Sequence, residues 1–157
     1  MKEHHYLATI RWTGNLGTGT SAYRAYSRDH LISSSGKPDV PGSSDPAFRG
    51  DKSRYSPEDS LLGALSACHM LWYLHLCADN KIIAEEYLDE ARGTLLENAD
   101  GSGQFTEVTL HPRVVITDAA MQEKAAALDS DAHRWCFVAR SVNFPVHHQP
   151  EIVIKKK

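Results

Sequence analysis

Apolar and polar residues alternate in the N-terminal part of the chain. From Tyr6 to Trp12 bulky apolar residues alternate with others, and residues 23–32 are rich in Tyr and Ser. Gly17 and Gly19 lie between these segments and favour a turn. The pattern predicts opening β-strands. Residues 33–55 then form a connection rich in Ser, Gly and Pro, whose length indicates a functional role.

A long apolar helix is predicted after this connection. Ser56 suits the N-cap because its hydroxyl can accept hydrogen bonds from the free amides of the first turn, and Pro57 suits the first helical position. Glu58 and Asp59 favour the positive end of the helix dipole. Beyond Leu61 the segment is apolar on nearly every side. We therefore expect it to pack on all faces, within the fold or against a second subunit.

The C-terminal half is predicted to contain a hairpin, a second helix and a last strand. Segments 87–97 and 105–117 flank an Asp-Gly-Ser-Gly turn at 100–103. Apolar residues then recur at helical spacing: Met121, Ala125, Leu128, Ala132, Trp135 and Ala139. Residues 151–155 predict a closing strand. The order β-β-β-α-β-β-α-β, with two long helices and antiparallel sheets, predicts an α+β fold in one domain over 1–157.

Composition narrows the class of protein. The 157 residues are 41% hydrophobic and 24% charged, as in an ordinary globular protein, and the net charge of -3 favours neither nucleic acid nor an anionic membrane as a partner. Three cysteines and the absence of a signal-like N-terminus predict the cytoplasm. The apolar segment 61–78 contains polar residues and falls short of the ~20 apolar residues of a membrane span, so we interpret it as a buried central helix.

The cysteines are the main candidates for chemistry. On helical geometry Cys77 points about 180° away from Cys68, whereas Cys136 lies on the apolar edge of the second helix. Cys68 and Cys136 therefore both face inward and can meet. A stabilised thiolate attacks peroxide oxygen and a second thiol resolves the product, so the two predict thiol redox chemistry. The competing interpretation is that both are packing residues.

Other chemistries have weaker support. His133 and Cys136 form the one short helical pair with ligand spacing, and zinc needs further ligands, so we expect no metal and no cofactor. His4-His5 and His147-His148 are interpreted as surface pairs. A Cys-His nucleophile using His69 is disfavoured because adjacent helical residues diverge by about 100°.

Residues 56–68, SPEDSLLGALSAC, resemble the Asn-Pro-Glu-Glu-Leu and Ala-Cys element of the OsmC/Ohr family of thiol peroxidases. Residues 132–141, AHRWCFVARS, resemble the second cysteine element of that family. The predicted order of elements agrees over nearly the whole chain. The chain departs from the family pattern at Ser56 (usually Asn), His69 (usually Phe) and Phe137 (usually Pro), which marks a divergent branch.

The resemblance implies site roles. It makes Cys68 the peroxidatic cysteine, Cys136 the resolving cysteine and Glu58 the carboxylate that holds an arginine near the reacting sulfur. The arginine comes from the loop before the first long helix in relatives of the OsmC branch. That position best matches Arg49, with Arg28 and Arg54 as alternatives.

The resemblance also implies partners. The substrate would be an organic hydroperoxide, preferred over hydrogen peroxide because apolar side chains bury its alkyl tail: Leu65, Leu71, Trp72 and Phe137. The reductant would be a dithiol of the lipoyl or thioredoxin type. Glu58 and Cys68 are ten helical residues apart, or ~15 Å, so one chain's helix cannot join them. Glu58 of the partner subunit would then approach Cys68 in an intertwined homodimer, as in the family.

Two rival interpretations follow from the same residues. In a non-enzymatic small-molecule-binding or stress-related dimer, the apolar helix builds the dimer core and the cysteines only pack. A thiol hydrolase would need Cys68 but not Cys136.

Overall fold

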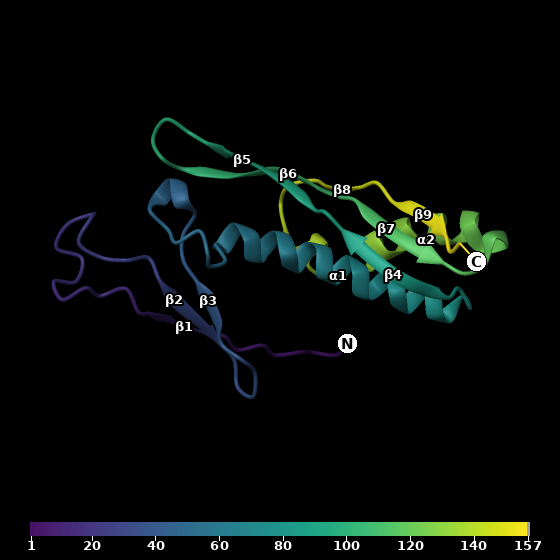
Figure 1. Cartoon of the computed structure of the whole chain (residues 1–157), viewed down its shortest axis with the longest axis horizontal. Helices are drawn as coiled ribbons and strands as arrows, with labels where there is room; N and C mark the ends of the chain where they lie inside the picture. Colours follow the sequence, from purple (N-terminus) through teal and green to yellow (C-terminus); the bar gives the residue numbers. More distant parts are fainter. Residues whose placement is uncertain (157) are drawn as a thin grey trace. The chain divides into compact units, whose positions relative to one another are not determined.

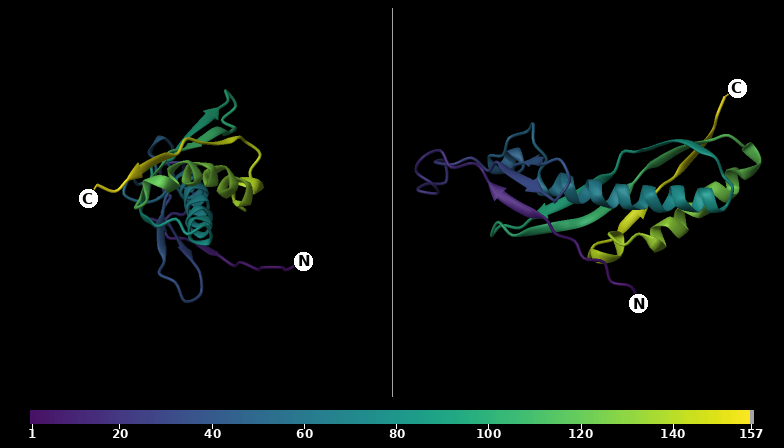
Figure 2. Two further views of the ribbon diagram at one scale, coloured as in Figure 1. Left: turned by 90° about the vertical axis from the view of Figure 1, so that its right-hand side faces the viewer. Right: turned by 90° about the horizontal axis from the view of Figure 1, so that it is seen from below.

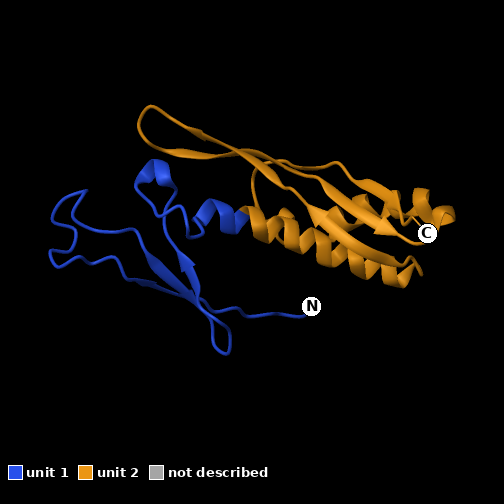
Figure 3. Cartoon of the chain, viewed as in Figure 1, with its two compact units in different colours: residues 1–61 blue, residues 62–157 orange. Residues whose placement is uncertain are grey.

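The computed structural model describes residues 1–156 and divides into two compact units, Met1–Leu61 and Leu62–Lys157 (Figure 3). Helix α1, Pro57–Asp79, begins in the first unit and continues into the second. The prediction of one domain over 1–157 stays a prediction.

The first unit contains one antiparallel sheet of three strands in the order β1-β2-β3 (Figure 1). The strands are β1 (Thr9–Trp12), β2 (His30–Ser33) and β3 (Val40–Gly42). β2 is the central strand, and its Ile32 pairs with Ile10 on one side and Val40 on the other. The strand predicted within 6–12 is confirmed as β1, and β3 and the short 3-10 helix η1 (Pro46–Phe48) lie inside the predicted connection 33–55.

The predicted strand over 23–32 is wrong for most of its length, because only its last residues enter β2. The Arg28 guanidinium donates to the carbonyl oxygens of Tyr26 at 2.7 Å and Tyr23 at 2.8 Å. It also lies over both tyrosine rings, 4.4 Å from the Tyr23 centroid and 4.2 Å from that of Tyr26. These cation–π contacts hold the segment in a turn rather than in an extended ladder.

The start of α1 is confirmed with its cap. The Ser56 hydroxyl accepts from the Asp59 amide at 3.0 Å, and the Asp59 carboxylate accepts from the Ser56 amide at 2.9 Å. This reciprocal capping satisfies the free amides at the helix start. Glu58 and Asp59 lie in the first turn, as the sequence predicts.

The second unit has two sheets, each of three strands. The first has the order β4-β7-β9 and the second β5-β6-β8. The first sheet consists of β4 (Ala84–Asp89), β7 (Pro112–Ile116) and β9 (Glu151–Ile154). The second consists of β5 (Arg92–Glu97), β6 (Gly103–Leu110) and β8 (Val146–His148). The β7–β9 and β6–β8 pairs are parallel, and the others are antiparallel.

The two long strands predicted at 87–97 and 105–117 are each divided in two. Asp89 lies at the break between β4 and β5, where its carboxylate accepts from the His111 amide at 2.6 Å. His111 lies at the break between β6 and β7, so one carboxylate stabilises both interruptions. The Ser66 hydroxyl of α1 also donates to Asp89, at 2.5 Å. The predicted hairpin is confirmed as β5–β6, and Gly101 at its tip has a φ of 83°.

Helices α1 and α2 (Gln122–Trp135) lie beside the strands of the second unit (Figures 1 and 2). The main apolar core lies between these helices and the β4-β7-β9 sheet. Its buried members are Tyr73, Cys77, Ile82, Val114, Ile116, Ala125, Leu128 and Ala132. The predicted α+β fold is therefore confirmed.

Both helices differ from the prediction in detail. Only one stripe of α1 is buried in the chain, at Leu65, His69, Tyr73 and Cys77, so α1 does not pack on all faces within one chain. Helix α2 ends at Trp135 rather than near Ala139, since Cys136 has an extended backbone with ψ 107°. Two short 3-10 helices flank this region, η2 (Ala119–Met121) and η3 (Ala139–Ser141).

By length and composition alone, α1 is apolar enough to cross a membrane. Its Tyr73 and Cys77 side chains instead lie in the core of the second unit, and Tyr73 Oη donates to the Ala125 carbonyl of α2 at 3.0 Å. One stripe of α1 therefore packs in the core of the second unit.

Truncation of Ile116 tests this core. Ile116 is fully buried on β7, so Ile116→Ala is expected to lower the free energy of unfolding by about 2–5 kcal/mol, as for other buried aliphatic side chains. Ile83, which is 63% exposed, provides the matched control, and Ile83→Ala should change the stability little. Urea denaturation of both variants measures the difference. Equal losses would contradict the assignment of the core.

Candidate thiol redox site

Cys68 and Cys136 come from the two long helices of the second unit. Cys68 lies on α1 and is partly exposed, whereas Cys136 forms the C-cap of α2 and is only 1% exposed. The Cys136 amide donates to the His133 carbonyl at 3.3 Å, and Cys136 Sγ accepts from the Ala139 amide at 3.4 Å. Hydrogen bonds to residues before and after it in the sequence thus hold both the backbone and the sulfur of Cys136 in place.

The two thiols lie close enough to interact. Burial, reinforced by the interaction with the neighbouring Cys68 thiol, raises the pKa of Cys136 to about 11. Cys136 therefore stays a protonated thiol at neutral pH. Two cysteines far apart in the sequence are therefore neighbours in the fold.

The raised pKa predicts slow alkylation of Cys136. In the reduced native protein, its reaction with iodoacetamide should accelerate only as the pH approaches 11, because the thiolate is the reacting form. In the unfolded protein the same thiol should react around its ordinary pKa of about 8.5. Peptide mapping after alkylation over a pH series measures both profiles. Rapid labelling of native Cys136 at pH 8 would contradict the prediction.

Cys77 takes no part in this pair. It is 2% exposed and lies in the apolar core with Tyr73, and burial raises the pKa of its thiol. Its role in the structure is packing.

An aromatic cluster surrounds the outer part of α1 near Cys68. The Trp72 ring stacks on Trp135 with centroids 5.9 Å apart and meets Phe137 edge-on at 5.6 Å. Leu71, Trp72 and His75 line a shallow cavity of about 210 Å³. Trp135 and Phe137 flank Cys136, so an apolar surface borders the thiols. Such a surface can bind an alkyl or aryl group.

Leu65 does not belong to this surface. It is fully buried in the stripe of α1 that includes His69. The prediction that Leu65 contacts a peroxide tail is therefore wrong, since its side chain is already enclosed by protein.

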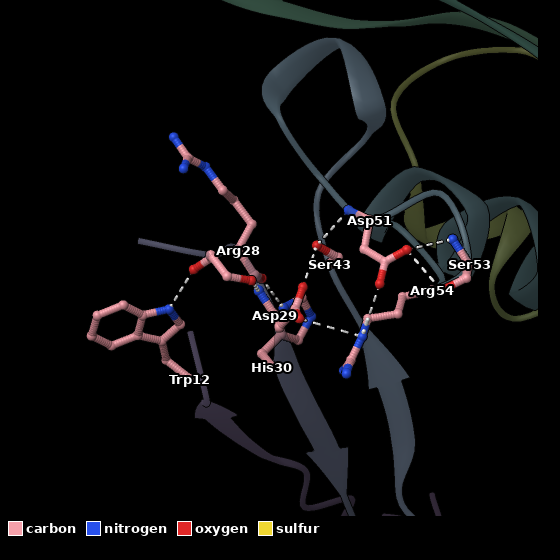
Figure 4. A network of polar contacts seen from close by, with 9 residues as sticks. Trp12, Arg28, Asp29, His30, Ser43, Asp51, Ser53 and Arg54 are labelled. Carbon is pink, nitrogen blue, oxygen red and sulfur yellow. Dashed lines mark hydrogen bonds and ion pairs between the residues drawn. The ribbon is translucent and has the colours of Figure 1, made fainter. Parts of the chain in front are cut away.

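The arginines of the first unit differ in their contacts. Arg28 is held by Tyr23 and Tyr26, as described above. Arg54 lies 3.6 Å from carboxylate oxygens of both Asp29 and Asp51 (Figure 4). Ser43 joins the two acids, since its hydroxyl donates to Asp29 and accepts from the Asp51 amide, each at 3.0 Å. Arg54 thus has a structural role in its own loop.

Arg49 makes no side-chain hydrogen bond or ion pair within residues 1–156, and its backbone has a φ of 66° after η1. Glu58 has one buried carboxylate oxygen, Oε2, with no hydrogen-bond partner in the same described range. No contact joins these two side chains there. A buried carboxylate oxygen without a donor is costly, so Glu58 is suited to bind a cation from outside its immediate surroundings.

One histidine that the sequence predicts at the surface, His148, lies elsewhere. His4 and His5 are exposed, as predicted, but His148 is not a surface residue, because it bonds the buried Asp129. Burial and the nearby His148 and His69 lower the pKa of His133. Over residues 1–156, no three or more His, Cys, Asp or Glu side chains are arranged to hold a metal ion.

The chain is thus an α+β protein in which two neighbouring thiols come from α1 and the end of α2. The family model for OsmC-like protein matches residues 50–151, which is more than half of the chain. The chain belongs to the OsmC-like family.

Solved structures agree with this membership. An OsmC-like protein of unknown function from Vibrio cholerae superposes with a TM-score of 0.85 at 28% identity, covering 94% of this chain and 99% of that one. An organic hydroperoxide resistance protein OsmC from Legionella pneumophila gives 0.69 at 16% identity, covering 98% and 99%. OhrB, the organic hydroperoxide resistance protein of Bacillus subtilis, gives 0.63 at 21%, covering 95% and 98%. No curated protein sequence matches the chain.

Sequence reasoning missed Asp129 as a buried polar residue. Asp129 lies four residues after Ala125 and three before Ala132, which places it on the apolar face of α2. Helical periodicity alone could therefore have predicted its burial. His148 gave no comparable signal, because its place on a three-residue strand depends on the parallel pairing of β8 with β6.

Proposed function

We propose that this protein is a thiol-dependent peroxidase that reduces organic hydroperoxides through Cys68 and Cys136. The observation that carries the proposal is the approach of the partly exposed Cys68 to the buried, protonated Cys136. Membership of the OsmC-like family and the similarity to proteins named for organic hydroperoxide resistance support it.

The chemistry takes two steps on the protein. The Cys68 thiolate attacks the outer peroxide oxygen, the O–O bond breaks, and the alkoxide leaves and takes up a proton to become an alcohol. Cys68 becomes a sulfenic acid. The Cys136 sulfur then attacks the Cys68 sulfur, and the S–O bond breaks as the S–S bond forms. The hydroxide leaves as water with the Cys136 proton.

An external dithiol closes the cycle. Exchange with the Cys68–Cys136 disulfide transfers two electrons and restores both thiols. We propose a reductant of the lipoyl or thioredoxin type. The three free thiols of the chain suit a reducing compartment, and we propose a cytoplasmic location.

The cavity beside Trp72 provides the substrate preference. Its lining by Leu71 and Trp72, with Phe137 packed on Trp72, is suited to an alkyl or aryl tail. Burial of that tail favours organic hydroperoxides over hydrogen peroxide. Equal or faster turnover of hydrogen peroxide would contradict this preference.

Arg49 is proposed to stabilise the Cys68 thiolate, and Glu58 to hold the guanidinium through its unpartnered oxygen. Arg28 and Arg54 are less suited, because both are engaged by neighbouring groups in their own unit. One helix keeps Glu58 about 15 Å from Cys68, so we propose that Glu58 of the partner subunit acts at this chain's sulfur.

A homodimer also explains the apolar surface of the single chain. All six residues of β5 are exposed, including Leu95 and Leu96, and Ile10 of β1 is 62% exposed. A second chain packed on such residues would remove their apolar side chains from water. Light scattering on the eluting protein should give twice the 17.4 kDa of one chain. A monomer at micromolar concentration would contradict the proposed dimer.

The proposed function is tested by adding one equivalent of cumene hydroperoxide to the reduced protein. The intact mass should fall by two hydrogens, and non-reducing digestion should show Cys68 joined to Cys136. An unchanged mass, or slow scattered addition of oxygen, would overturn the peroxidase proposal. A non-enzymatic binding dimer with structural cysteines would then explain the chain better.

A further inference from the structure

A buried polar network adjoins the thiol site but has no place in the chemistry above. Asp129 of α2 is 1% exposed, and each of its carboxyl oxygens is bonded to a histidine. His69 Nε2 of α1 lies 2.9 Å from Oδ1, and His148 Nδ1 of β8 bonds Oδ2. His69 itself is fully buried. The network therefore joins three separate elements of the second unit.

The contacts fix the direction of the hydrogen bonds. His69 Nδ1 is buried and has no partner within residues 1–156, so the proton of this ring belongs on Nε2, which donates to Asp129. His148 donates from Nδ1 to the other oxygen. Its ring also packs on His133 with centroids 4.8 Å apart. Both carboxyl oxygens are thus satisfied by side chains from outside α2.

Such a network costs free energy, since His69 Nδ1 has no partner within residues 1–156 although both carboxyl oxygens are hydrogen-bonded. Taking a carboxyl group and two imidazoles out of water is unfavourable, and apolar side chains of similar volume would fill the same space at lower cost. A side-chain network of this kind fixes one arrangement of the elements that it joins.

Two residues of the network lie near the two cysteines in the sequence. His69 directly follows Cys68 on α1. Asp129 precedes Cys136 by seven residues, or about two turns of α2, so it lies on nearly the same side of that helix. The His133 carbonyl, one turn beyond Asp129, accepts the Cys136 amide. The bond between His69 and Asp129 therefore ties the two cysteine-bearing helices together near the sulfurs.

We propose that the His69–Asp129–His148 network holds α1 and the end of α2 in the register in which Cys136 can attack oxidised Cys68. These three are positioning residues, and the proposal rests on the proposed function. A disulfide tolerates only a narrow range of sulfur and Cα separations, so a small shift of one helix impairs its formation. The network acts on the second step, and peroxide attack at Cys68 does not depend on it.

The test compares His69→Phe, which keeps a ring but loses the donor, with His69→Gln, whose Nε2 can still donate to Asp129. Each reduced variant is mixed with cumene hydroperoxide in the presence of dimedone, which traps sulfenic acid. For His69→Phe, disulfide formation should slow by about tenfold or more, since misplacement of reacting groups by ~1 Å has effects of this size or larger. The rate at which peroxide oxidises the Cys68 thiol should stay unchanged in His69→Phe. In His69→Gln the rate of disulfide formation should return to that of the unchanged protein.

Asp131→Asn is the matched control, because Asp131 is a half-exposed acid of the same helix whose one ion pair within residues 1–156 is with Arg134. It should behave as the unchanged protein. If His69→Phe does not fold, His148→Leu removes the other donor at a less buried position. Disulfide formation at the unchanged rate in a folded variant without the donor would overturn the proposal. Equal slowing of both steps would do the same, since general destabilisation would then explain it.

A second measurement separates this proposal from the peroxidase function. Equilibration with glutathione redox buffers, without peroxide, reports how favourably Cys68 and Cys136 are placed for a disulfide. In His69→Phe the equilibrium constant for the disulfide should fall about tenfold, with recovery in His69→Gln. No change would overturn the positioning proposal. Failure of the unchanged protein to react with peroxide, beside a clear shift in this equilibrium, would overturn only the peroxidase function.

Discussion

Replacement of Cys68 by serine is expected to abolish the reduction of organic hydroperoxides, with a loss of at least about a thousandfold in rate. Serine keeps the size of the side chain but has no thiolate at neutral pH, so no group at this position attacks the peroxide oxygen. Consumption of cumene hydroperoxide with a dithiol reductant measures the effect. Cys136 should then remain a free thiol after peroxide treatment, because its partner is missing.

Cys77→Ala is the matched control for Cys68→Ser. Cys77 lies on the same helix but in the apolar core, 2% exposed, so its truncation should cost stability and leave peroxide reduction intact. Similar activity in Cys68→Ser and the unchanged protein would sink the assignment of Cys68 as the attacking thiol. A loss in both variants, with retained folding, would show that the assay reports something other than the proposed site.

Local signals in the sequence predict the parts of the fold that depend on short-range physics. Ser56 and Asp59 form the expected cap because a helix start needs acceptors for its free amides, whatever surrounds it. The hairpin around Gly101 is predictable for a similar reason, since its turn requires a backbone that glycine adopts readily.

The breaks in the predicted strands depend on longer contacts. Asp89 interrupts both long strands through its bond to the His111 amide, 22 residues away. Asp89 is of a type common in turns and Pro112 follows His111, but nothing in the sequence pairs Asp89 with the His111 amide. The strand predicted over 23–32 fails for a related reason, because the Arg28 guanidinium gathers the backbone carbonyls of the tyrosines that suggested a strand.

Some features of the candidate site can likewise be predicted from local sequence, and others depend on long-range contacts. Helical geometry alone predicts that Cys77 points away from Cys68, and the structure buries Cys77 in the core. The prediction that Cys68 faces inward is wrong in part, because the buried stripe of α1 includes Cys77 and not Cys68, which is partly exposed beside the buried Cys136. The Asp129 network could not be predicted, since His148 reaches Asp129 only through the parallel pairing of β8 with β6.

Replacement of Cys136 by serine is expected to distinguish a two-cysteine peroxidase from a thiol hydrolase. The variant should react with one equivalent of peroxide as fast as the unchanged protein, because Cys68 is intact. Its intact mass should then rise by one oxygen and stay there, since no thiol is present to form the disulfide. Steady-state turnover with a dithiol reductant is expected to fall by about a hundredfold, as the reductant must attack the sulfenic acid directly.

The buried setting of Cys136 calls for a second variant. Cys136→Ala removes the thiol without placing a hydroxyl where the side chain is 1% exposed, and it should give the same stable oxygen adduct. If both variants retain full turnover with peroxide, Cys136 is not the resolving thiol. If both hydrolyse a simple ester through Cys68 without any oxidant, a thiol hydrolase explains the site better. Accumulation of the Cys68 sulfenic acid in both variants fits only a mechanism in which Cys136 resolves it.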